Sequence, residues 1–183
     1  MFGIFLAFVF GLGWIPLYLY RAESMGDALP HYSPVEQRWV KLTPTVIAVH
    51  VSLSCPLVSV AEPPPWRGTA GLILFAAGVA FWFWARLQIG PLRVTRLPNE
   101  PPRQLRRDGA FGIVRNPLYF GYLVVAAAPV VVALRPVLLL TFAACVAVLT
   151  VRADQEERRL LRQLGPAYAV YRDSVKRLVP FVW

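Results

Sequence analysis

The segment Gly109-Ala-Phe-Gly-Ile-Val-Arg-Asn-Pro-Leu-Tyr-Phe-Gly121 passes directly from a polar, turn-rich stretch into an uncharged apolar run, Leu118–Leu134. A second apolar run, Pro136–Val151, follows after a connection so short that the two runs predict a tight helical hairpin. Another polar block then extends from Glu156 to Pro180. Two polar blocks at the mouth of a membrane hairpin predict a ligand site where lipid meets water.

The composition around this hairpin indicates a single integral membrane domain over residues 1–183. Hydrophobic residues make up 57% of the chain, charged residues only 16%, and the mean hydropathy is +0.52. A membrane-spanning helix needs about 20 mostly apolar residues, with a range of roughly 17–25. Arg152 can extend the last and shortest run by snorkelling. We therefore expect an all-α bundle of five transmembrane helices: Phe2–Tyr20, Pro44–Ala61, Gly68–Ala85, Leu118–Leu134 and Pro136–Val151.

The distribution of basic residues predicts the orientation of this bundle. With five spans, 17 of the 19 Lys and Arg residues fall on one side, and only Arg67 and Arg135 on the other. The positive-inside rule then places the amino terminus outside and both polar blocks in the cytoplasm. Basic cytoplasmic loops also suit an anionic leaflet, so the net charge of +9 needs no nucleic-acid partner. The excess of Arg over Lys indicates a bacterial protein of high-GC composition, in the inner membrane.

The polar segments predict further short helices. Ser33–Lys41 resembles an interfacial helix behind a Ser cap. Ala153–Leu164 is rich in helix formers and is followed by Gly165-Pro166, after which Ala167–Lys176 predicts another short helix. These last two would form a cytoplasmic helical cap. The loop Gly90–Arg107 holds four prolines and five arginines, so it is not one regular helix, and its length is typical of a functional loop.

Mid-span polar and cysteine residues have simpler interpretations. His50 is expected to be a hydrogen-bonded core residue, although an ionisable group inside the membrane is also typical of functional sites. Cys55 and Cys145 both lie inside predicted spans, where cysteine behaves as a small hydrophobe. Neither cysteine has the spacing of a metal ligand, and no metal is expected.

Two groups of residues are candidates for chemistry. Asn116 is placed to cap a helix that starts at Pro117, and the amino terminus of such a helix favours a carboxylate or carbonyl oxygen. Tyr119 offers a ring for stacking. Glu156 and Glu157 form a carboxylate pair that suits an ammonium group or ribose hydroxyls. The charge pattern alone favours the other interpretation of this pair, a solvated helix face paired with neighbouring arginines.

Taken together and in order, the two polar blocks resemble the isoprenylcysteine carboxyl methyltransferase family, which is grouped with phospholipid methyltransferases. The shared pattern is Gly-Ala-Phe, Arg-Asn-Pro-x-Tyr-x-Gly, an apolar hairpin, Glu-Glu-x-x-Leu, Gly-x-x-Tyr-x-x-Tyr and Arg-x-x-Pro. It covers about the last 95 residues closely. The matching residues are Gly109, Phe111, Arg115, Asn116, Pro117, Tyr119, Gly121, Glu156, Glu157, Leu160, Gly165, Tyr168, Tyr171, Arg177 and Pro180.

The resemblance implies binding of S-adenosylmethionine by residues 88–121 and 152–183, with a lipophilic acceptor entering from the membrane. It gives Arg115 and Glu156 catalytic roles. Asn116 stands where family members often have His, and Arg103 where many carry another His. The cofactor-binding residues that it implies are Arg103, Leu105, Gly109, Phe111, Arg115, Asn116, Pro117, Tyr119, Gly121, Glu156 and Glu157.

The acceptor and two rival functions stay open at this point. A carboxylate acceptor needs no base, only neutralisation by Arg115 or Arg103, whereas a thiol or amine must lose a proton. The bacterial composition favours a lipophilic acceptor other than a prenylated protein. One rival is a non-enzymatic membrane protein that binds anionic lipid or a partner through its basic loops. The other is a nicotinamide-dependent reductase of sterol-like double bonds.

Overall fold

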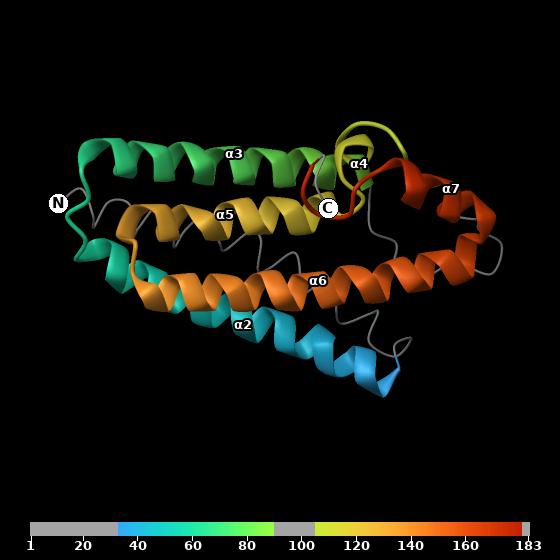
Figure 1. Ribbon diagram of the computed structural model, residues 1–183, viewed down its shortest axis with the longest axis horizontal. Coiled ribbons are helices and arrows are strands. Elements are labelled where there is room, and N and C mark those ends of the chain that lie inside the picture. Colours follow the sequence, from blue (N-terminus) through green and yellow to red (C-terminus); the bar gives the residue numbers. More distant parts are fainter. Residues whose placement is uncertain (1–32, 90–104, 181–183) are drawn as a thin grey trace.

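The computed structural model describes residues 33–89 and 105–180, and within these ranges every regular element is a helix (Figure 1). This confirms the all-α prediction for the described part of the chain. The amino-terminal span Phe2–Tyr20 lies outside it, as does most of the loop Gly90–Arg107. The helices are α2 (Pro34–Ser59), α3 (Pro65–Ile89), α4 (Ala110–Ile113), α5 (Pro117–Ala133), α6 (Pro136–Leu164) and α7 (Pro166–Ser174).

Helix α2 merges two elements that the sequence predicts to be separate, the interfacial helix Ser33–Lys41 and the span Pro44–Ala61. Its start is as predicted: the Ser33 hydroxyl accepts from the Glu36 amide at 3.3 Å, and the Glu36 carboxylate accepts from the Ser33 amide at 2.8 Å. The boundary at Pro44 was wrong, because an internal proline removes only one backbone donor. The buried face continues through it, with Val40, Thr43 and Ile47 on either side.

Helix α6 likewise joins the predicted span Pro136–Val151 to the predicted cap helix Ala153–Leu164 in one helix of 29 residues. No residue between the two segments stops a helix, and Arg152, at the junction, is only 5% exposed. The end at Gly165 is as predicted, since this glycine has a φ of 54°, in the region where glycine carries no steric penalty. The cap therefore starts as a direct continuation of a membrane helix.

The helices pack in pairs, with α3 against α5 and α2 against α6, and α5 lies between α3 and α6 (Figure 1). Three helices, α2, α3 and α6, are long and apolar enough to cross a membrane, and α5 is a shorter apolar helix of 17 residues. The protein is thus a helical membrane protein. Its total of five spans stays a prediction, because the first predicted span is outside the described residues.

His50 ties three of these helices together inside the bundle. It is fully buried on α2, and its Nε2 lies 3.0 Å from the Ala126 carbonyl of α5. Since a carbonyl only accepts, Nε2 carries the proton, and Nδ1 accepts from the Thr141 hydroxyl of α6 at 2.8 Å. This confirms the prediction of a hydrogen-bonded core histidine.

The close contact between α3 and α5 depends on glycine. A Cβ atom at Gly78 would lie 2.8 Å from the Val125 amide nitrogen, and one at Gly121 would lie 2.9 Å from the Trp82 Cβ. Neither distance is compatible with a side chain unless the backbones move apart. The two helices therefore approach as closely as they do because both positions lack a side chain.

We expect Gly78→Leu to lower the free energy of unfolding by about 3 kcal/mol, because overpacking a well-packed core costs about 1–3 kcal/mol even for smaller additions. The measurement is thermal unfolding of the detergent-solubilised protein. Ala77→Leu is the matched control, since it adds bulk at the next position of α3, which faces outward. Equal effects of the two substitutions would contradict the packing argument.

Candidate functional site

Residues 114–116 are fixed by the chain just after α7. Val114 and Lys176 form an isolated parallel bridge. The Arg115 amide donates to the Lys176 carbonyl at 2.8 Å, and the Asn116 amide donates to the Arg177 carbonyl at 3.2 Å. Two segments about 60 residues apart in the sequence are thereby joined through their backbones at the start of α5.

Glu157 is the centre of a buried cluster at this junction, which we call the Glu157 cluster: Glu157, Arg115, Asn116 and Arg177. Its Oε1 accepts from Arg115 Nε at 3.2 Å and from Asn116 Nδ2 at 2.9 Å, and its Oε2 lies 3.3 Å from Arg177 Nη2. The glutamate is only 4% exposed. Buried charges of this kind are stable only when they are paired and hydrogen-bonded, and here two guanidinium groups and an amide surround one carboxylate.

Asn116 occupies the predicted position at the start of α5, and Pro117 is the first residue of the helix, as expected. The predicted cap hydrogen bond was wrong, however, because the Asn116 side chain makes no bond to the helix. Its amide instead donates to Glu157 and to the Arg177 carbonyl, the latter at 3.2 Å. Competition from a buried carboxylate explains the difference.

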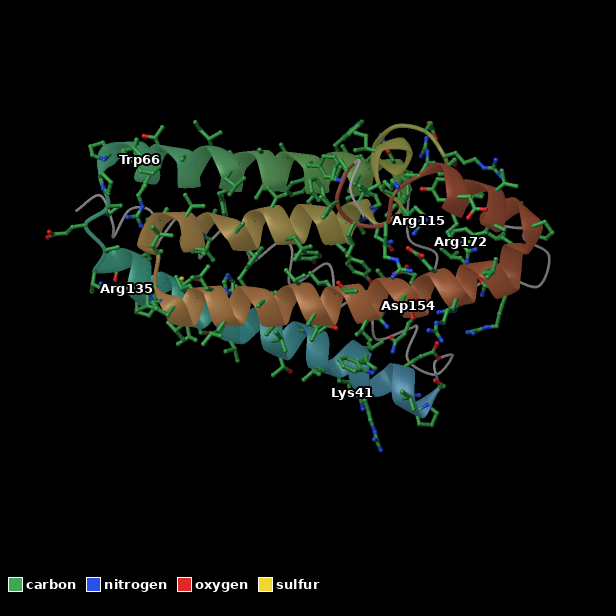
Figure 2. All side chains as sticks on the ribbon, in the orientation of Figure 1. Lys41, Trp66, Arg115, Arg135, Asp154 and Arg172 are labelled. Carbon is green, nitrogen blue, oxygen red and sulfur yellow. The ribbon has the colours of Figure 1, made fainter. Side chains whose placement is uncertain are left out.

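Arg115 also holds the end of α7. Its Nη1 donates to the Val175 carbonyl at 3.0 Å and to the Arg172 carbonyl. Carbonyls at a helix carboxyl terminus have no partner within the helix and carry partial negative charge, so a guanidinium is a favourable partner. Figure 2 shows Arg115 and Arg172 at the same end of the molecule as Asp154, and Trp66 and Arg135 at the opposite end.

The neighbouring glutamate has different surroundings. Glu156 is exposed, and its Oε2 accepts from the Tyr119 hydroxyl at 2.9 Å. Adjacent residues on a helix point about 100° apart, which separates the two carboxylates. Glu157 thus points into the protein, whereas Glu156, with Tyr119, forms an accessible acidic group beside the start of α5.

Two tyrosines of α7, Tyr168 and Tyr171, are buried at this end of the protein, and each is 2% exposed. Their rings meet at a tilted angle of 61°, with centroids 5.8 Å apart. The Tyr171 hydroxyl donates to the Phe111 carbonyl of α4 at 2.6 Å. Burial raises the pKa of Tyr171 to about 12, and burial together with the Glu157 carboxylate also raises the pKa of Tyr168.

Helix α4 is anchored on its other side by Gln88 of α3, whose Oε1 accepts from the Ala110 amide at 3.0 Å. Arg106 Nη1 in turn donates to the Gln88 carbonyl. Gly109 precedes Ala110 with a φ of 58°, and a Cβ at this position would lie 2.2 Å from Gln88 Nε2. Only glycine fits both the conformation and the space there.

The structure brings six of the predicted site residues together: Arg115, Asn116, Pro117, Tyr119, Glu156 and Glu157. Phe111 joins this group through its carbonyl, and Gly109 lies at the start of α4. Gly121 is apart from them, against Trp82 in the contact between α3 and α5. Leu105 is half-buried at the edge of the described residues, and Arg103 lies outside them.

Sequence reasoning missed Arg177, Gln88 and the tyrosine pair as members of the site. Arg177 and both tyrosines belong to the motifs on which the family resemblance rests. The sequence therefore marked their positions but did not indicate what their side chains contact. Gln88 has no such motif around it. Only the folded chain shows that α3 ends beside α4.

We expect Glu157→Gln to lower the free energy of unfolding by about 3 kcal/mol, because removing one partner of a buried ion pair leaves the others uncompensated. Glu156→Gln is the matched control, since it makes the same change at an exposed neighbour and should alter stability by less than about 0.5 kcal/mol. Thermal or denaturant unfolding in detergent measures both. Similar losses in the two variants would contradict the assigned environments.

The decrease in the free energy of unfolding at alkaline pH should depend on Tyr171. Its pKa is about 12 in the folded protein, against about 10 in an unfolded chain, so the unfolded state loses this proton first. The contribution is therefore fully present below about pH 10 and is lost as the pH rises to about 12. Unfolding measured across this range should show a shallower decline in Tyr171→Phe than in the wild type. If the free energy of unfolding fell equally with pH in both proteins, Tyr171 would not have a raised pKa in the folded state.

Comparison with known proteins gives one family match. The sequence model of the isoprenylcysteine carboxyl methyltransferase family matches residues 71–162, which is half of the chain. The matched region runs from α3 to near the end of α6 and includes both the Arg115–Tyr119 segment and the two glutamates. No curated protein matches the chain.

Proposed function

Since this chain belongs to the isoprenylcysteine carboxyl methyltransferase family, we propose that it is an S-adenosylmethionine-dependent membrane methyltransferase with its site between the start of α5 and the glutamates of α6. The observation that carries the proposal is the junction of two segments in the matched region. Tyr119 bonds to Glu156 and Asn116 to Glu157, although each pair is about 40 residues apart in the sequence.

The chemistry of the donor set fits S-adenosylmethionine. This molecule has an ammonium group, a carboxylate, ribose hydroxyls and a positively charged sulfonium. The exposed carboxylate of Glu156 suits the ammonium or the hydroxyls, and its charge complements the sulfonium. The amino terminus of α5 carries partial positive charge, which suits the carboxylate.

S-adenosylmethionine, when bound, supplies a methyl group that its sulfonium makes electrophilic. The protein then has to hold the donor and the acceptor in line and keep water out. We assign binding to Glu156 and Tyr119. The Glu157 cluster fixes the segment that carries Tyr119 relative to α6, so its residues act as positioning groups.

Arg115 was predicted to be catalytic by neutralising an anionic acceptor. Its contacts favour a positioning role instead, because its guanidinium already bonds to Glu157 and to two carbonyls of the α7 end. A residue outside this cluster would then neutralise the charge of the acceptor, and the exposed basic residues just before α4 include Arg106 and Arg107.

We propose a lipophilic acceptor that reaches the site from the bilayer. Of the helices below the site, α2, α3 and α6 expose apolar side chains on their outer faces, and the site lies at one end of the bundle (Figure 1). By the distribution of basic residues, this end faces the cytoplasm, where S-adenosylmethionine is made. The family match favours this function over both a lipid-binding protein without activity and a nicotinamide-dependent reductase.

The test is calorimetric titration of the detergent-purified protein with S-adenosylmethionine and S-adenosylhomocysteine. We expect saturable binding by the wild type, weakened at least tenfold by Glu156→Gln, since a hydrogen bond to a charged group contributes about 1.5–3 kcal/mol. Glu62→Gln is the control, because this exposed glutamate lies in the connection between α2 and α3, at the other end of the bundle. No binding by folded wild-type protein would refute the proposal.

A further inference from the structure

Helix α4 receives a hydrogen bond for its first amide from another helix. Ala110, at the first position of α4, is fully buried, and the first amides of a helix have no partner within it. Gly109, the residue before it, has no side chain that could accept a hydrogen bond. The acceptor is the half-buried side chain of Gln88 on α3, whose Oε1 lies 3.0 Å from the Ala110 nitrogen. Gln88 thus satisfies a buried amide that α4 cannot satisfy itself.

The same residue also contributes to the end of α3. Gln88 is the last residue but one of this helix, and its main-chain carbonyl accepts from Arg106 Nη1. Carbonyls in the last turn of a helix have no partner within the helix, and a guanidinium is a favourable one. Residues 106–110 are therefore attached to Gln88 at both of their ends, through its carbonyl and through its side chain.

The contact between Gln88 and α4 depends on Gly109. A Cβ atom at this position would lie 2.2 Å from Gln88 Nε2 and 2.7 Å from Gln88 Oε1. The family resemblance implies that Gly109 takes part in binding the cofactor. The geometry gives a different reason for a glycine here, which is that it leaves room for the Gln88 side chain.

The position of α4 matters because the chain continues from it into residues 114–119, which end at Tyr119 beside Glu156. Tyr171 holds α4 from the side of α7, and Gln88 holds it from α3. A binding site works only when the groups that form it are kept close to the right geometry. Loss of the Gln88 contact would free α4 on the side of α3 and let the following residues move relative to α6.

We propose that Gln88 is a positioning residue of the site: it holds the start of α4 from α3 and so fixes the stretch that carries Tyr119 for binding S-adenosylmethionine. The inference rests on the proposed function and extends it to a residue that no motif of the family resemblance includes. It makes the oxygen of the side chain at position 88 the important feature, because only an acceptor satisfies the Ala110 amide.

The experiment compares Gln88→Met with Gln88→Glu in the full-length protein. Methionine has a similar length but offers only a sulfur, a weak acceptor, whereas glutamate keeps an acceptor oxygen, beside the Arg106 guanidinium. Gln163→Met is the matched control, since it makes the same change at an exposed position of α6. Affinity for S-adenosylhomocysteine is measured by calorimetry well below the unfolding temperature of every variant, and that temperature is measured separately without ligand.

We expect Gln88→Met to bind S-adenosylhomocysteine about fivefold more weakly than the wild type, because a buried amide loses its acceptor and α4 loses its attachment to α3. Gln88→Glu should bind within about twofold of the wild type, since the acceptor is retained. Gln163→Met should bind as the wild type does.

Two results would overturn the inference. Wild-type affinity in folded Gln88→Met protein, even with a lower unfolding temperature, would show that the contact contributes to stability alone. Equal losses of affinity in Gln88→Met and Gln88→Glu would show that the acceptor oxygen is not the important feature.

If Gln88→Met does not fold, Gln88→Asn takes its place in the same comparison. Asparagine keeps the amide but is one methylene shorter, so its oxygen does not reach the Ala110 nitrogen from the same backbone position. If the wild type binds no S-adenosylhomocysteine, the proposed function itself fails, and the role of Gln88 in binding fails with it.

Discussion

The pairing of one buried carboxylate with two guanidinium groups holds the site end of this protein together. Glu157 contacts Arg115, Asn116 and Arg177, which belong to the segment before α5 and the segment after α7. The backbones of the two segments are joined by the Val114–Lys176 bridge and by two hydrogen bonds, but neither of these connections reaches α6. The carboxylate therefore supplies a specific polar attachment of both segments to α6.

The two adjacent glutamates show how helix geometry divides one motif between two tasks. Glu157 stabilises the arrangement, and Glu156, about 100° further round the helix, is left exposed beside Tyr119. A buried carboxylate paired with Arg115, Asn116 and Arg177 is poorly placed to bind a ligand, because it would have to give up those partners. The proposed division, with one glutamate for position and one for binding, follows from this competition.

Much of the architecture could be predicted from the sequence, because the long apolar runs and the helix boundaries at Gly165 and Pro117 depend only on neighbouring residues. The errors have tertiary causes. Pro44 and the junction at Arg152 look like helix boundaries in the sequence, but α2 and α6 pack against each other and each has buried residues on both sides of its predicted boundary. For the site, the motifs identified the two segments that meet in the structure, the start of α5 and the glutamates of α6. They did not reveal that Asn116 bonds to Glu157 rather than capping α5, because that choice depends on a partner about 40 residues away.

The length of α6 explains why the proposed site lies at a lipid–water boundary. From Pro136 to Glu156 the helix rises about 30 Å, at about 1.5 Å per residue, which equals the thickness of a bilayer's hydrocarbon core. Helix α5 spans about 25 Å, and it begins at Pro117 beside the glutamates. In the proposed function, a donor dissolved in water would therefore reach Glu156 from the cap side, and an acceptor dissolved in lipid would approach along the bundle. Because α6 is continuous through Arg152, the lipid-facing and water-facing parts of the site are held on one rigid element.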